Sequence, residues 1–377
     1  MNVKNSIIPA LSNNNHELFH SNLWKWLIDI DKDFLNVFFE NVDINKIKKL
    51  EVLREYRHMD LVIKDNEKNY FVIENKLKSI PNEEQLNEYK NKIDKESKNK
   101  SKYLIVNLIK NEQMGKNGWD SINYIDIAKR IERILEQKKK VKQVKKYYDL
   151  LKEYCDFIKK EFKSIINSKY IKNNHFCFND KGIKPKHIEY GLKVIYQKMK
   201  SEIIKNKIDK IVKLEELNKN LENEDLFIVS LLGYYNGKPC FTYRVQKLWK
   251  NKLGEHNAIE IQLEGDQHRH MIRLKKSKGK GKKVSKKLKD EYYRRALEIC
   301  KGTDFLCKNN RKTIHGKSNN MRDDYCSYDS GKNNIGIYQY YKMKENVSYK
   351  KVGKEIKGDL EKYLRKKSII KYLKEEK

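Results

Sequence analysis

Asp60, Glu74 and Lys76 are charged residues within segments whose other residues are typical of buried strands. Charged groups are rarely buried unless they are paired or bound to a cation. If the loop between the two strands spans residues 66–68, Asp60 lies directly opposite Glu74, whereas a two-residue loop leaves the pair near-diagonal. Either register brings the two carboxylates within several ångströms of each other.

Two neighbouring carboxylates could hold a metal ion in such a place. They repel each other unless a proton or a metal lies between them, and Mg²⁺ bound by two carboxylates keeps its remaining positions open to water and phosphate. Lys76 shares a strand face with Glu74, so its ammonium could lower the pKa of that water or stabilise charge on a pentacoordinate phosphate. The three residues therefore predict metal-dependent phosphodiester cleavage.

The spacing of these residues also resembles a known motif. Asp60, thirteen intervening residues and then Glu74-Asn75-Lys76 resemble the D-x(n)-E-x-K core of the PD-(D/E)XK nuclease superfamily. Met59 stands where the family name has proline, a frequent substitution, and Asn75 fills the variable position. The resemblance implies that Asp60 and Glu74 bind the metal, Mg²⁺ with Mn²⁺ as a substitute, and that Lys76 assists the attacking water.

Two further elements resemble the RecB-like branch of that superfamily. Gln85 and Tyr89 match its Q-x-x-x-Y element, and Glu17 matches its first-helix carboxylate, which by resemblance supplements the metal shell. Gln85 and Tyr89 are four residues apart on a predicted helix, so they share a face and could contact substrate or orient the site. The resemblance covers residues 15–135. The alternative is a buried ion-pair network without catalysis.

The elements around these residues predict an α/β core, and the resemblance implies a restriction-endonuclease-like PD-(D/E)XK fold with a mixed central sheet flanked by helices. Asn13–Asn15 offers an N-cap to a first helix. Its predicted apolar face is Phe19, Leu23, Trp26, Leu27 and Ile30, and a second stripe carries Glu17, His20 and Trp24. Strands are predicted at 51–57, 59–64, 70–73, 103–109 and 119–124, and helices at 81–95 and from 125.

The remainder of the chain predicts two further regions. We expect a nuclease domain at residues 1–140, a helical connector at 141–222 and a C-terminal α+β domain at 223–377. The last domain should hold antiparallel strands at 226–235, 240–246, 258–263 and 268–274, a Tyr-rich strand at 335–343 and a terminal helix from 351. It could serve nucleic-acid recognition or oligomerisation, and a homodimer is one arrangement that the sequence leaves open.

Charge points to nucleic acid as the partner. The formal net charge is +32, a field that concentrates polyanions and makes binding salt-dependent. The abundance of Lys, Asn, Ile and Tyr also fits an AT-rich genome, so part of this charge is expected to be solvated surface. The lysine run at 275–289 is either a phosphate-contacting loop or a plain solvated one.

Other signals are weak or absent in the sequence. No apolar run approaches the roughly 20 residues of a membrane span, and residues 1–12 lack a signal peptide's pattern, so we expect a cytoplasmic protein.

The six cysteines include no C-x-x-C pair. His268 and His270 alternate on one strand face, with His256 and His315 elsewhere, but no cysteine or carboxylate stands at a recognisable zinc-site spacing. The sequence gives a zinc site little support.

These observations together favour a Mg²⁺-dependent DNA endonuclease, a phosphodiester hydrolase acting in bacterial restriction, phage defence or repair. One alternative is a catalytically silent nucleic-acid-binding protein on a nuclease fold, and another is a basic structural or RNA-associated protein. The sequence does not determine whether the substrate is DNA or RNA, or whether cleavage is endonucleolytic or exonucleolytic. It also leaves open the target specificity, the oligomeric state and the biological trigger.

Overall fold

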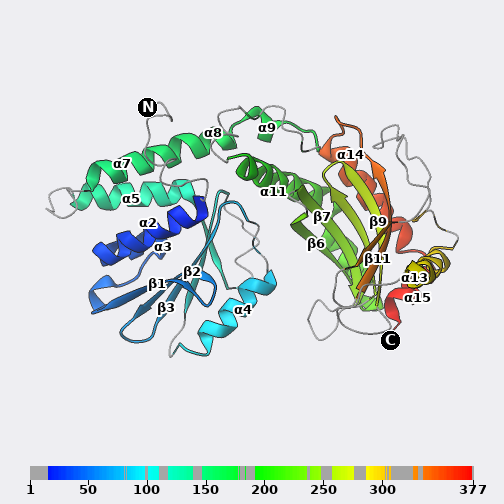
Figure 1. The fold of residues 1–377 in the computed structure, drawn as a ribbon, viewed down its shortest axis with the longest axis horizontal. Coiled ribbons are helices and arrows are strands. Elements are labelled where there is room, and N and C mark those ends of the chain that lie inside the picture. The colour runs from blue at the N-terminus through cyan, green and yellow to red at the C-terminus, as the bar shows by residue number, and fades with distance from the viewer. Residues whose placement is uncertain are drawn as a thin grey trace. The chain divides into compact units, whose positions relative to one another are not determined.

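The computed structural model of the chain divides into two compact units (Figure 1). Unit 1 comprises residues 1–172 and 181–199, and unit 2 comprises 173–180 and 200–377. The structure describes residues 16–79, 81, 83–97, 101–109, 118–138, 147–176, 178, 183, 192–235, 238–247, 257–275, 286–301, 303, 305–306, 326–329 and 334–375.

Unit 1 is built on a five-stranded mixed sheet with strand order β1-β2-β3-β4-β5. Its strands are β1 (Leu50–Tyr56), β2 (Met59–Asp65), β3 (Tyr70–Lys76), β4 (Lys102–Asn107) and β5 (Asp120–Asn123). The first three are antiparallel, and β4 and β5 run parallel to β3. Arg57 and His58 have positive φ angles of 53° and 72°, which suits the tight turn between β1 and β2. The predicted mixed α/β sheet is confirmed.

Helices cover both faces of this sheet. The helix α2 (His16–Ile30) packs on β1, β2 and β3, while α4 (Glu83–Asp94) makes the crossover from β3 to β4 (Figure 1). The side chains of α4 join Val62 of β2 and Tyr70 and Val72 of β3 in one core cluster. The other helical elements of unit 1 are η2 (Lys32–Phe34), α3 (Leu35–Phe38), η3 (Ile44–Lys46), α5 (Tyr124–Lys138), α7 (Tyr148–Phe157), the π-helical η5 (Ile158–Phe162), α8 (Lys163–Ile166) and α9 (Lys169–Lys172).

The buried face of α2 differs from the predicted apolar face. Its buried side chains are His20, Ser21, Trp24, Leu27 and Ile28, so of the five predicted positions Leu27 alone is fully buried. The reason is a polar contact: His20 Nδ1 and Trp24 Nε1 lie 3.0 and 3.2 Å from the hydroxyl of Tyr154 on α7. Because buried polar groups need hydrogen-bond partners, the stripe of α2 that carries His20 and Trp24 faces the interior.

Unit 2 contains a six-stranded antiparallel sheet with strand order β10-β11-β9-β8-β7-β6. The strands are β6 (Leu226–Tyr235), β7 (Lys238–Lys247), β8 (Ala258–Glu264), β9 (Gln267–Lys275), β10 (Cys326–Asp329) and β11 (Asn334–Lys342). Its helices are α12 (Leu214–Leu221), η6 (Glu222–Glu224), α13 (Lys286–Ile299), α14 (Tyr349–Tyr363) and α15 (Lys367–Lys374). The predicted C-terminal α+β region is confirmed.

One helix lies where no element was predicted, and another belongs partly to each unit. The helix α13 begins in the last residues of the lysine-rich segment, whereas residues 276–285 of that segment lie outside the described residues. The long helix α11 (Lys193–Val212) starts in unit 1 and continues into unit 2. Of the other helices within residues 141–222, α7, η5, α8 and α9 belong to unit 1 and α12 belongs to unit 2.

Among the residues that the structure describes, none of the helices combines the length and the apolar character needed to cross a bilayer.

Candidate functional site

The register of β2 and β3 fixes the position of the two carboxylates. Leu61 pairs with Ile73, so one step further along both strands Asp60 stands opposite Glu74. The backbone N–H of Asp60 donates to Glu74 Oε2 at 3.3 Å. In the other direction, the backbone N–H of Asn75 donates to Asp60 Oδ2 at 2.7 Å. Each carboxylate is therefore held by the partner strand's backbone.

Lys76 completes the charged group at the end of β3. Its Nζ lies 2.8 Å from Glu74 Oε1, and both side chains are buried, at 8% and 4% exposure. Alternation along the strand puts Glu74 and Lys76 on the sheet face that α4 covers, since they continue the series of Tyr70 and Val72. Three ionisable groups thus converge at one strand end.

The electrostatics of this group favour a cation. Burial, together with the nearby charge of Glu74, raises the pKa of Asp60 to about 7. Burial also raises the pKa of Glu74, although the charge of Lys76 and its hydrogen bond oppose this. Burial would lower the pKa of Lys76, but the charges of Glu74 and Asp60 outweigh it and raise that pKa. A pair of carboxylates with raised pKa values is stabilised by added positive charge.

The helix α4 contributes a chain of hydrogen bonds to this group. Lys76 Nζ donates to Gln85 Oε1 at 3.3 Å, and Gln85 Nε2 donates to the hydroxyl of Tyr89 at 2.6 Å. That hydroxyl donates in turn to the backbone carbonyl of His58 at 2.7 Å. The structure brings Gln85 and Tyr89 together with the charged group, and their contacts orient Lys76.

Glu17 lies at the same end of the sheet, where its Oε1 accepts three hydrogen bonds. The donors are the backbone N–H of Lys78 at 2.6 Å, the backbone N–H of Ser79 at 2.9 Å and the Ser79 hydroxyl at 3.1 Å. The charge of Glu17 contributes to the raised pKa values of Asp60 and Glu74. One oxygen of Glu17 therefore fastens the segment after β3.

Asn75, at the variable position of the motif, faces the opposite side of the sheet. Its Nδ2 donates to the backbone carbonyl of Glu17 at 2.9 Å and to the hydroxyl of Ser21 at 3.2 Å, and the hydroxyl of Tyr124 donates to its Oδ1. The side chain is 2% exposed. Asn75 thereby ties β3 to α2 and α5 while its neighbours face the site.

Lys198 of α11 is a site residue that the sequence analysis missed. Its Nζ donates to the backbone carbonyl of Lys76 and, at 2.7 Å, to Asn107 Oδ1, and the residue is 1% exposed. A buried ammonium with these partners holds the end of β3 against the end of β4. Because lysine is common throughout this chain, nothing in the sequence indicates that Lys198 is buried.

The other polar residues near the motif make ordinary contacts. His20 is fully buried and packs among aromatic rings. His58 lies in the exposed β1–β2 turn, two residues before Asp60. Arg54 Nε donates to the backbone carbonyl of Asp60 at 3.1 Å, and Arg57 pairs with Glu96.

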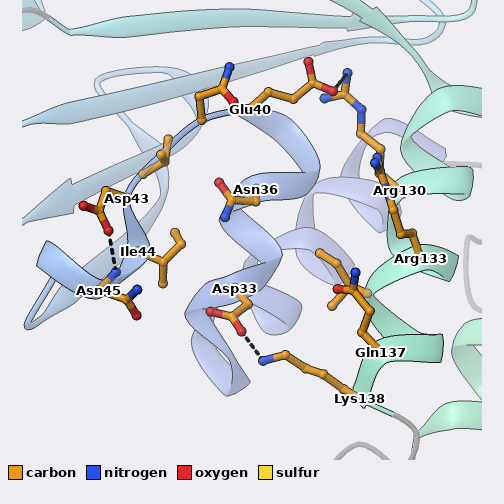
Figure 2. A pocket seen from close by; sticks show the side chains of 13 residues that line it. Asp33, Asn36, Glu40, Asp43, Ile44, Asn45, Arg130, Arg133, Gln137 and Lys138 are labelled. Carbon is orange, nitrogen blue, oxygen red and sulfur yellow. Dashed lines mark hydrogen bonds and ion pairs between the residues drawn. The ribbon is translucent and has the colours of Figure 1, made fainter.

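A separate polar hollow of about 610 Å³ lies elsewhere in unit 1, between the α3–η3 segment and α5. Figure 2 shows Lys138 reaching toward Asp33 across one side and Arg130 near Glu40 on another. The lining residues include none of the predicted site residues. Oppositely charged side chains already pair around this hollow, which distinguishes it from the carboxylate cluster.

A family model described as "PD-(D/E)XK nuclease superfamily" matches residues 7–229. No curated protein and no solved structure matches the chain. The matched segment contains Glu17, Asp60, Glu74, Lys76 and Lys198 and ends within β6.

Proposed function

This chain belongs to the PD-(D/E)XK nuclease superfamily, and we propose that it is a Mg²⁺-dependent endonuclease that hydrolyses phosphodiester bonds in DNA. The observation that carries the proposal is the convergence of Asp60, Glu74 and Lys76 at the end of β3. Members of this superfamily typically use divalent metal ions. Restriction, phage defence or repair in a bacterium is the biological role we propose, and the RecB-like assignment of Gln85 and Tyr89 stays a prediction.

The donor set fits a hard divalent cation. Asp60 and Glu74 would hold Mg²⁺, or Mn²⁺ in its place, since carboxylate oxygens are the ligands that these ions prefer. Glu17 would be an auxiliary ligand through Oε2, because its Oε1 is engaged by residues 78 and 79. A bound ion would supply positive charge to the phosphate and lower the pKa of the attacking water.

The remaining groups would position Lys76 and neutralise charge on the phosphate. Lys76, held by Gln85 and by its pairing with Glu74, would stabilise negative charge that develops on the phosphate. The hydrogen-bond chain through Tyr89 would keep the ammonium in place as the substrate arrives. Lys198 would keep the β3 backbone under Lys76 in register with β4.

The charge of the chain supports a polyanionic substrate. A net charge of +32 favours binding to phosphate backbones, with an affinity that falls as salt is added. We propose that residues 223–377 recognise the nucleic acid or join two copies of the chain, alongside a nuclease domain at 1–140 and a helical connector at 141–222.

The test is cleavage of plasmid DNA, single-stranded DNA and RNA in Mg²⁺, Mn²⁺ or EDTA by the wild type, Asp60→Asn and Lys76→Met. Lys64→Met is the matched control, because Lys64 is a half-buried lysine of β2 that pairs with Glu51. The proposal expects DNA cleavage that requires the metal, is lost in both site variants and is kept in the control. Salt-sensitive DNA binding without cleavage of any substrate would refute it in favour of a silent binding protein.

A further inference from the structure

Two histidines interrupt the apolar face of β9 in unit 2. His268 and His270 alternate on the strand face that continues with Ile272 and Leu274, both members of the core of this unit. Both histidine side chains are fully buried. Histidine is a common metal ligand, and buried polar groups need partners, so the contacts of these two rings decide their role.

A carboxylate from α14 meets the two imidazoles. Asp359 is 3% exposed and lies between the core residues Ile356 and Leu360. Its Oδ2 is 2.9 Å from His270 Nε2 and 3.9 Å from His268 Nε2. One ligand atom from each of the three residues lies within 4.8 Å of the others. Ligands about 2.0 Å from a tetrahedral zinc ion lie about 3.3 Å apart, a value between the two measured distances.

The hydrogen bond on the far side of His270 fixes its tautomer. Its Nδ1 lies 3.0 Å from the backbone carbonyl of Phe305, which can only accept, so Nδ1 carries a hydrogen. In the neutral ring Nε2 then presents a lone pair to Asp359, itself an acceptor. Two acceptors 2.9 Å apart require positive charge between them. Histidines that bind a metal through one ring nitrogen usually donate a hydrogen bond from the other, often to a backbone carbonyl, as Nδ1 of His270 does.

We propose that His268, His270 and Asp359 bind a zinc ion that fastens α14 to β9. A proton on His270 would bridge that ring and Asp359, and His268 directs a second imidazole nitrogen to the same carboxylate. Two imidazoles and one carboxylate suit zinc, and the burial of all three favours a structural ion over a catalytic one. This site is independent of the proposed nuclease activity.

The experiment measures bound metal in the tag-free full-length chain carrying Asp60→Asn and Glu74→Gln, so that ions at the nuclease site do not contribute. Inductively coupled plasma mass spectrometry should find about one zinc ion per chain. This zinc should be lost when His268→Gln or Asp359→Asn is added. His175→Gln is the matched control, because His175 is an exposed histidine of the same unit. Circular dichroism checks that each variant is folded.

A second measurement needs no variant at the zinc site. Zinc added to the chelator-treated chain should raise the Tm of the chain by about 5 °C. The X-ray absorption spectrum of the bound zinc should show two imidazole ligands and identify the fourth ligand. A zinc-free chain whose Tm is unchanged by added zinc would overturn the proposal and leave a His270–Asp359 ion pair. Zinc content that is equal in the folded His268→Gln variant would overturn it too.

Discussion

Replacing Asp60 by asparagine should abolish cleavage and yet stabilise the metal-free protein at alkaline pH. The carboxylate is buried beside Glu74, and its pKa is raised from 3.8 to about 7. Between these two values the folded protein retains a proton that the unfolded chain has released. Its stability therefore falls as pH rises toward 7. Asparagine can still accept the hydrogen bond from the Asn75 backbone but carries no charge.

The size of this effect follows from the pKa difference. One pKa unit corresponds to about 1.4 kcal/mol, so the variant should gain up to about 4 kcal/mol at pH 8 and less than half of that at pH 5. A gain in stability that falls by more than half between pH 8 and pH 5 is the signature of a charge that folding buries. Saturating Mn²⁺ should remove the gain, because the cation stabilises the wild type alone.

Urea unfolding in EDTA at the two pH values, followed by tryptophan fluorescence, measures this gain. Trp24 and Trp119 are fully buried in unit 1, so their emission reports on the unit that contains Asp60. The control is Asp29→Asn, an exposed aspartate of α2 that pairs with Lys25. An equal gain at pH 5 and pH 8, or a less stable variant at pH 8, would refute the argument from buried carboxylate repulsion.

The remaining predictions concern catalysis. Lys76→Met should lower the cleavage rate about 100-fold or more, because the developing phosphate charge loses its ammonium, while Mn²⁺ still raises Tm. Lys198→Met should lower kcat about 10-fold with little change in KM, since the β3 backbone under Lys76 loses its anchor. Cleavage at sub-saturating Mg²⁺ should rise with pH through about 7, because Asp60 must lose its proton before it binds a cation.

Each of these predictions has a control and a result that would contradict it. For Lys76 the control is Lys64→Met, and a variant that cleaves at the wild-type rate would remove the lysine from the proposed chemistry. For Lys198 it is Lys210→Met, an exposed lysine of the same helix; an equal loss in both variants would mean that α11 acts through stability alone. A pH profile that stays as steep at saturating Mg²⁺ would assign the titration to another group.

The parts of the site that lie close in sequence could be predicted. The hairpin of β2 and β3 fixes the register between Asp60 and Glu74, and four-residue spacing puts Gln85 and Tyr89 on one face of α4. Periodicity is less informative for α2, where a hydroxyl contributed by α7 determines which stripe is buried.

Contacts between distant segments left no sequence signal. Lys198 is 122 residues from the carbonyl that it contacts, and its type is common throughout the chain. Asp359 is 89 residues from His270, so no metal-ligand spacing connects them. Such pairings depend on how helices dock onto sheets, which local patterns do not encode.

The continuity of α11 has a consequence for attempts to transplant the catalytic module. A fragment that ends with α5 would keep Asp60, Glu74 and Lys76 but would lose Lys198, which arrives on a helix whose later turns belong to unit 2. Because helices form cooperatively, trimming those turns would fray the turn that carries Lys198. Fusions that join this nuclease to a DNA-binding protein should therefore retain α11 to its end at Val212 and attach the new partner beyond it.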